Sequence, residues 1–154
     1  MDDMNTGVRP AEILLVEDNA DDVELMRISF DRNRFAANLH VVTNGEDCMD
    51  FLKRQGEWSA APRPDLLLLD LNMPRMDGRE VLEQIVHDPK LCDIPIVVLT
   101  TSTADPDISA AYKLRCSSYI VKPVDFEQFT RVVRGITDYW FSLVVLPTSR
   151  HTAE

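Results

Sequence analysis

The chain has 154 residues, of which 45% are hydrophobic, and this size and composition suit one domain with a single buried core. Sixteen basic and twenty-six acidic residues give a net charge of −10, which argues against nonspecific binding to nucleic acid or to an anionic membrane as the main role. The chain start lacks the features of a secretory signal, no apolar run approaches the ~20 residues that cross a bilayer, and three cysteines without a CxxC pair indicate a reduced, cytoplasmic setting.

Short apolar runs of β type alternate along the chain with longer stretches of helical periodicity. The runs predict five strands, in residues 12–17, 39–43, 65–71, 94–100 and 118–121. One helix is predicted after each strand: around Val23 to Phe30, from near Asn44 to Gly56, from Gly78 to an exit at Pro89, from Asp105 to Leu114, and from near Asp125. Apolar strands joined by crossover helices require a parallel sheet covered on both faces, so we expect a doubly wound α/β fold.

Polar side chains stand where these strands end, at the edge where such sheets bind their ligands. In chain order they are Glu17, Asp18, Asp70, Thr100, Thr101 and Lys122. Carboxylates that converge there repel one another, and a hard divalent cation relieves the repulsion; Mg²⁺ prefers one or two carboxylates, water and a phosphate oxygen. The sequence therefore favours a site in which Asp18 and Asp70 bind Mg²⁺ and Asp70, with a lysine nearby, attacks phosphorus.

Four motifs in register with the strand ends also carry a family resemblance. They read LLVEDNADD, DLLLLDLNMPRMDG, VVLTTS and YIVKP. In this order and spacing they resemble the receiver domain of two-component response regulators over about residues 12–137. The resemblance implies a flavodoxin-like sheet of strand order 2-1-3-4-5. It also implies a signalling phosphoacceptor that catalyses only its own phosphorylation and dephosphorylation, and so not an enzyme in the usual sense.

The resemblance assigns the phosphoacceptor and the metal ligands. Asp70 would be phosphorylated by a histidine kinase. Asp18, Asp70 and the main-chain carbonyl of Asn72 would bind Mg²⁺, with Glu17 acting through water. Many relatives have aspartate at the position of Glu17, so the longer side chain here departs from the pattern.

The resemblance also assigns residues to the phosphoryl group and to the switch. Lys122 would pair with the phosphoryl group, and Thr100 would donate a hydrogen bond to it. Thr101 ranks below Thr100 because side chains alternate along a strand. Tyr119 would swing with the state of Thr100, although a half-buried strand aromatic is the alternative interpretation. The Lys122–Pro123 peptide bond is cis in this family.

Asp21, Asp22 and Glu24 extend the acidic run after the first strand. They fall in the first turn of a predicted helix, where negative charge interacts favourably with the helix dipole. A structural role is therefore favoured over metal binding for these three residues.

Three other functions fit the predicted fold less well. A flavin carrier needs a hydroxyl-rich phosphate loop after the first strand, where this chain has Glu17 and Asp18. A phosphatase of the DxDx[TV] type needs a second acid where Asn72 follows Asp70. A degenerate receiver that only binds partners is disfavoured because the strand-end residues are intact.

The chain stays strongly apolar beyond the point at which the fold should be complete. After Asp138 the large apolar residues are Trp140, Phe141, Leu143, Val144, Val145 and Leu146. A helix that is apolar on all sides is usually buried, and an uncovered patch marks a protein interface. We therefore expect a flexible N-terminus (1–11), a receiver domain (12–137), an apolar extension that forms a homodimer (138–147) and a polar tail (148–154).

The ending GITDYWFSLVVLP, together with DLNMPRMDGREVL and VVLTTS, resembles the single-domain response regulators paired with bacterial and cyanobacterial phytochromes. Those proteins dimerise through their C-terminal region. The resemblance implies a phytochrome-type kinase as the phosphoryl donor. No output domain fits into the residues after about 137, so signalling is expected through protein–protein interaction. A phosphorelay intermediate or a receiver for another kinase remains the alternative.

Overall fold

The computed structural model describes residues 10–33, 36–73, 75–101, 104–122 and 125–140. Its five strands are β1 (Ala11–Val16), β2 (Ala37–Val42), β3 (Leu66–Leu69), β4 (Ile96–Thr100) and β5 (Ser118–Val121). All neighbouring strands run parallel, in the order β2-β1-β3-β4-β5. The predicted doubly wound α/β fold and its strand order are confirmed.

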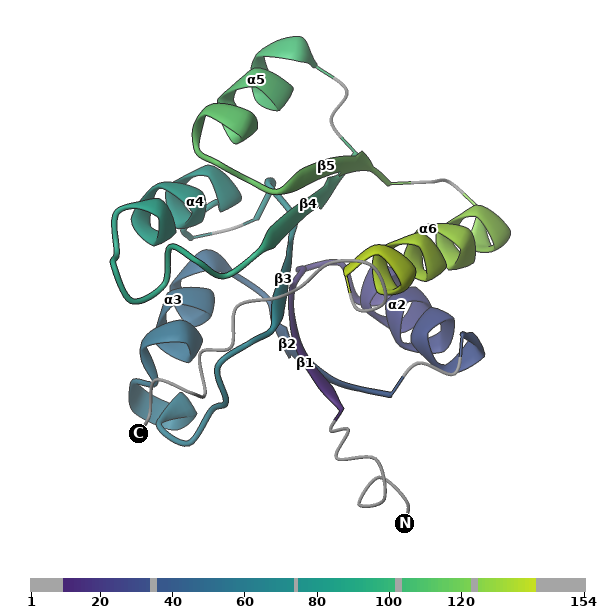
Figure 1. Ribbon diagram of the computed structural model, residues 1–154, viewed down its shortest axis with the longest axis horizontal. Helices are drawn as coiled ribbons and strands as arrows, with labels where there is room; N and C mark the ends of the chain where they lie inside the picture. Colours follow the sequence, from purple (N-terminus) through teal and green to yellow (C-terminus); the bar gives the residue numbers. More distant parts are fainter. Residues whose placement is uncertain (1–9, 34–35, 74, 102–103, 123–124, 141–154) are drawn as a thin grey trace.

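Helices cover both faces of this sheet (Figure 1). They are α2 (Ala20–Arg32), α3 (Gly45–Lys53), α4 (Gly78–Val86), α5 (Asp105–Lys113) and α6 (Phe126–Asp138), with a short 3₁₀ turn, η1 (Gly56–Trp58). Helices α2 and α6 lie side by side on one face, α3 and α4 lie on the other, and α5 packs beside β5. Among the described helices, none is long and apolar enough to span a membrane.

The four leucines of β3 show why the central strands are apolar without interruption. Leu67 and Leu69 pack into the core under α3 and α4, whereas Leu66 and Leu68 pack into the core under α2 and α6. All four side chains are fully buried. A parallel strand covered on both faces has no solvent side, so a polar residue has no place in it until the strand ends.

The strand β3 is shorter than the predicted span 65–71 because the chain turns at Asp70. The backbone NH of Asp70 still bonds to the carbonyl of Val16, at 3.1 Å. The next turn is local: Asn72 N donates to Asp70 Oδ1 at 3.2 Å. The side chain of Asp70 thus replaces the ladder partner that a longer strand would have supplied.

Helix α3 ends earlier than predicted. Asn44 caps its start as expected, with Oδ1 accepting from Asp47 N at 2.8 Å. The helix stops at Lys53, because Arg54 adopts the left-handed conformation (φ 57°) that was expected of Gly56. Gly56 also has a positive φ, but it begins η1.

Several predictions fall partly or wholly on residues outside the described ranges, among them the N-terminal segment (1–11) and the polar tail (148–154). The cis Lys122–Pro123 bond is another. The apolar extension also falls there in part: α6 ends at Asp138, and Tyr139 and Trp140 continue in π-helical geometry. Its remaining apolar members, Phe141, Leu143, Val144, Val145 and Leu146, lie outside the described residues.

Two glycines give a matched test of close backbone packing. A Cβ on Gly78 would overlap the carbonyl oxygen of Asp70 and lie 2.7 Å from Cα of Leu71, whereas a Cβ on Gly135 in α6 would meet nothing within 4 Å. We expect Gly78→Ala to lower the free energy of unfolding by at least about 2 kcal/mol. Gly135→Ala should raise it by about 0.5–1 kcal/mol, because alanine is the better helix former. Urea unfolding measures both, and equal shifts in the two variants would contradict the packing argument.

Candidate phosphoacceptor and metal site

The carboxylates of the strand ends converge as the sequence predicts. Glu17 and Asp18 follow β1, and Asp70 follows β3, which is hydrogen-bonded to β1. One oxygen from each of these three carboxylates lies within 4.8 Å of the others. Glu17 and Asp70 are buried, with 3% and 7% of their surfaces exposed, whereas Asp18 is exposed.

Lys122 brings the positive charge to this cluster. Its Nζ lies 2.5 Å from Glu17 Oε1, 2.8 Å from Asp22 Oδ2 and 3.5 Å from Asp70 Oδ2. Only 7% of its side chain is exposed. Its backbone NH donates to the carbonyl of Thr100 at 2.7 Å, so the end of β4 fixes the point from which the side chain starts.

Burial and ion pairing act in opposite directions on the charged groups. Burial raises the pKa of the Glu17 carboxyl to about 7, and the hydrogen bond from Lys122 offsets part of that effect. Burial lowers the pKa of Lys122, but hydrogen bonds to Asp22 and Glu17 outweigh it, and the net direction is upward. Lys122 is therefore a charged ammonium at neutral pH.

The donor set fits a hard divalent cation. The cluster supplies oxygen ligands from Glu17, Asp18 and Asp70. Asp22 adds a fourth carboxylate, and the single ammonium of Lys122 does not neutralise the combined negative charge. An excess of buried negative charge is costly unless it is paired or bound to a metal. The residues present therefore suit Mg²⁺, and Asn72 follows Asp70 closely enough for its main chain to contact the same carboxylate.

The hydroxyl of Thr100 is also unusual. Thr100 is fully buried, and its Oγ1 has no hydrogen-bond partner among the described residues. Buried hydroxyls are normally paired, so this one is available to a group bound at the site. Thr101 lies just past the end of β4 and is exposed.

Tyr119 lies in β5 on the same face of the sheet as Thr100. The register pairs Val98 with Tyr119 and Thr100 with Val121. Tyr119 is partly buried and packs against the core under α3 and α4. The sheet therefore places the two predicted switch residues on one face of adjacent strands.

Asp22 makes a contact at the site that the sequence analysis did not predict. It does lie in the first turn of α2, but its carboxylate also contacts Lys122, from 100 positions away in the chain. The available signal was geometric: α2 begins at the edge where the strands end, so its first turn faces the lysine that follows β5. Asp21, its neighbour, is exposed.

Comparisons with known proteins identify the family to which the chain is similar. A family model described as the response regulator receiver domain matches residues 13–134. The chain is 41% identical over 140 residues to the response regulator Rcp1 of Synechocystis sp., which covers 91% of this chain and 95% of Rcp1. It is 42% identical over 131 residues to the probable methanogenesis regulatory protein FilR2 of Methanothrix harundinacea, covering 85% of this chain and 84% of that protein.

Solved structures give the same result. The phosphorylated cyanobacterial phytochrome response regulator RcpA superposes with a TM-score of 0.87 at 41% identity, over 91% of this chain and all of that one. The Mn²⁺-bound form of Rcp1 superposes with a TM-score of 0.85 at 41% identity, over 90% of this chain and all of that one. With a family model that spans most of its length and relatives of this similarity, the chain belongs to the response regulator receiver domain family.

Proposed function

We propose that this receiver accepts a phosphoryl group on Asp70 from a histidine kinase in a Mg²⁺-dependent reaction, and that it signals through altered protein–protein contacts. The observation that carries the proposal is the cluster of Asp70 with Glu17 and Asp18 beside the buried ammonium of Lys122. Membership of the receiver family supports the same reaction. The output is then a shift between two conformational populations.

The chemistry follows from the groups present. A carboxylate oxygen of Asp70 attacks the phosphorus of a phosphohistidine, and an O–P bond forms as the P–N bond breaks. The electron pair of the broken bond stays on the imidazole nitrogen. Lys122 pairs with the transferred phosphoryl group, and Thr100 Oγ1 donates a hydrogen bond to it. In the later dephosphorylation step a water oxygen attacks phosphorus and the O–P bond to Asp70 breaks, so that inorganic phosphate leaves and the carboxylate is restored.

The metal would be held by Asp18, Asp70 and the main-chain carbonyl of Asn72, with Glu17 contributing through water. When bound, Mg²⁺ neutralises charge on the phosphoryl oxygens during transfer. The Mn²⁺-bound structure of the relative Rcp1 supports a divalent ion for this chain as well. Asp70 and Glu17 stay anchored by the protein itself, through Asn72 N and Lys122 Nζ respectively.

The switch would run from Thr100 to Tyr119. A phosphoryl group that accepts a hydrogen bond from the Thr100 hydroxyl draws that side chain toward Asp70. Thr101, the next residue, is exposed just past the end of β4. Space is then released on the face of the sheet that Thr100 shares with Tyr119. Tyr119 turns inward to fill it, which changes the surface around β5, α4 and α5.

Replacement of the phosphoacceptor tests the central assignment. Incubation of the protein with Mg²⁺ and acetyl phosphate should add one phosphoryl mass, as acetate leaves with the electron pair of the broken bond. Asp70→Asn should abolish the gain, because an amide is not a nucleophile here. Asp21→Asn, the removal of an exposed charge, is the matched control and should phosphorylate as wild type does. Intact-mass spectrometry reads all three, and a gain that survives Asp70→Asn would refute the assignment.

The raised pKa of Glu17 predicts a pH dependence of metal binding. With a pKa of about 7, the Glu17 carboxyl is mostly protonated at pH 6, and Mg²⁺ must displace that proton. The Mg²⁺ affinity should rise about tenfold from pH 6 to pH 8 and then level off. Calorimetric titration at several pH values measures this, and Glu17→Gln should bind with little pH dependence over the same range. An affinity that is equal at pH 6 and pH 8 in the wild type would contradict the prediction.

The partner kinase is proposed to be of the phytochrome type. RcpA, at 41% identity over all of its solved chain, is described as a phytochrome response regulator. FilR2, at similar identity, carries a different description, so a receiver for another kinase, or a phosphorelay intermediate, is the second candidate. We propose a cytoplasmic location for the reaction; the free thiols of Cys48, Cys92 and Cys116 support a reducing compartment.

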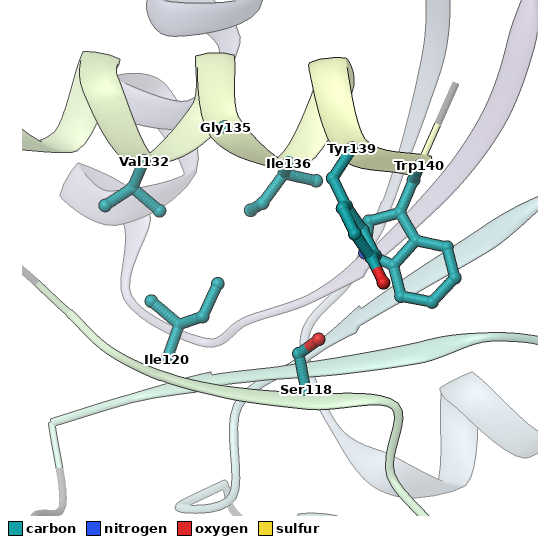
Figure 2. A pocket seen from close by; sticks show the side chains of 7 residues that line it. All are labelled: Ser118, Ile120, Val132, Gly135, Ile136, Tyr139 and Trp140. Carbon is teal, nitrogen blue, oxygen red and sulfur yellow. The ribbon is translucent and has the colours of Figure 1, made fainter. Parts of the chain in front are cut away.

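A homodimer is proposed through the C-terminal apolar residues. An apolar groove of about 260 Å³ lies between α6 and β5, lined by Ser118, Ile120, Val132, Gly135, Ile136, Tyr139 and Trp140. Figure 2 shows the side chains of α6 pointing toward Ile120 and Ser118, with the rings of Tyr139 and Trp140 at one end. Tyr139 is 52% exposed. Tyr139 therefore adds exposed surface at the start of the predicted extension (138–147), while the partly buried Trp140 lines the groove and packs against the core under α2 and α6.

Two truncations separate the extension from the polar tail. A chain that ends after Asp138 should sediment as a monomer at micromolar concentration, because Trp140 and the apolar residues after it are removed. The full chain and a chain that ends after Pro147 should sediment as dimers. Analytical ultracentrifugation distinguishes the states. A monomeric full chain, or a dimer that persists after truncation at Asp138, would rule out this interface.

A further inference from the structure

Lys122 faces two carboxylates more closely than it faces Asp70. An ammonium has three N–H donors. Glu17 Oε1 and Asp22 Oδ2 lie at hydrogen-bond distance from Nζ, at 2.5 and 2.8 Å, whereas Asp70 Oδ2 lies at 3.5 Å. The last distance exceeds that of an ordinary N–H···O bond. In this structure the Lys122 ammonium therefore donates hydrogen bonds to Glu17 and Asp22, and its contact with Asp70 is weaker.

The Asp22 carboxylate is held in place by the start of α2. Asn19 caps this helix: its Oδ1 accepts from Asp21 N at 2.9 Å and from Asp22 N at 3.1 Å. The backbone NH of Asn19 in turn donates to Glu17 Oε2 at 3.1 Å. Lys122, Glu17, Asn19 and Asp22 thus form a closed ring of contacts, in which Asp22 presents its carboxylate to the lysine from the helix side.

The two acceptors of Lys122 differ in how readily they can be released. Glu17 is almost fully buried. If Lys122 moved away, the Glu17 carboxylate would be left buried without a cationic partner, which is costly. The side chain of Asp22 is 25% exposed, so water can solvate its carboxylate when the lysine moves away. Among the described contacts of Lys122, the one to Asp22 is therefore the easier to give up.

On the basis of the phosphorylation function proposed above, we propose that Asp22 is a positioning residue that holds Lys122 in the unphosphorylated state and competes with the phosphoryl group on Asp70 for its ammonium. New phosphoryl oxygens on Asp70 then gain Lys122 at the expense of Asp22. Asp22 thereby favours the unphosphorylated state and sets how easily the phosphorylated state forms.

The test measures binding of a phosphoryl analogue, beryllofluoride, at saturating Mg²⁺, with the bound fraction followed by fluorine NMR. Asp22→Asn should lower the half-saturating concentration about five- to tenfold, the size expected for removing one competing charge-assisted hydrogen bond. Asp22→Glu keeps a carboxylate at this position, so its half-saturating concentration should stay close to that of the wild type. Asp21→Asn makes the same change in net charge one residue away without a described contact to Lys122 and should stay within about twofold of wild type.

The sign of the effect separates positioning from a structural role. Loss of a merely structural contact would weaken analogue binding or leave it unchanged, and thermal unfolding of Asp22→Asn checks that the fold is retained. Asp22→Asn binding that equals Asp21→Asn binding, or that is weaker than wild type, would overturn the role of Asp22 while leaving the phosphoacceptor function intact. A wild-type protein that binds no beryllofluoride and gains no phosphoryl mass would overturn the proposed function and this inference with it.

Discussion

The site depends on one buried ammonium among four carboxylates. Lys122 lies within 3.5 Å of oxygens from Glu17, Asp22 and Asp70, and Asp18 completes the acidic cluster. Without that charge, burying Glu17 and Asp70 together would be prohibitive, since an unpaired buried carboxylate costs several kcal/mol. With it, the site still carries excess negative charge. That residual negative charge suits the proposed divalent cation and the proposed phosphoryl chemistry.

The scaffold holds these groups in place by close backbone packing. The apolar strand β3 delivers Asp70 to the edge of the sheet, and Gly78 at the start of α4 lets the helix approach the carbonyl of Asp70. A Cβ on Gly45, at the start of α3, would likewise overlap the carbonyl oxygen of Met76. Helices α3 and α4 thus pack closely against Met76 and against Asp70 and Leu71, respectively, so we expect a change at Asp70 to be transmitted to them.

The short strand β5 links the site to two surfaces. Lys122 follows its last residue, Tyr119 faces the core under α3 and α4, and Ser118 and Ile120 line the groove beneath α6. Its pairing with β4 runs up to Thr100, whose carbonyl accepts from the backbone of Lys122. A displacement of Lys122 or Thr100 would therefore change the packing on both faces of β5, which offers a physical route from the proposed phosphoryl group to the proposed partner surface.

The alternation of strands and helices, the burial of β3 on both faces and the polar residues at the strand ends were all predictable from the amino-acid sequence, because hydrophobic periodicity and strand-end chemistry are local properties. The sequence also located the starts of two helices near Asn44 and Asp125, whose side chains accept hydrogen bonds from NH groups three residues further on. Tertiary structure decided the rest. The Asp22–Lys122 pair joins residues 100 positions apart, and the groove under Trp140 exists only where α6 meets β5. Such contacts depend on how packed elements meet in space, and no local pattern in the chain encodes that distance.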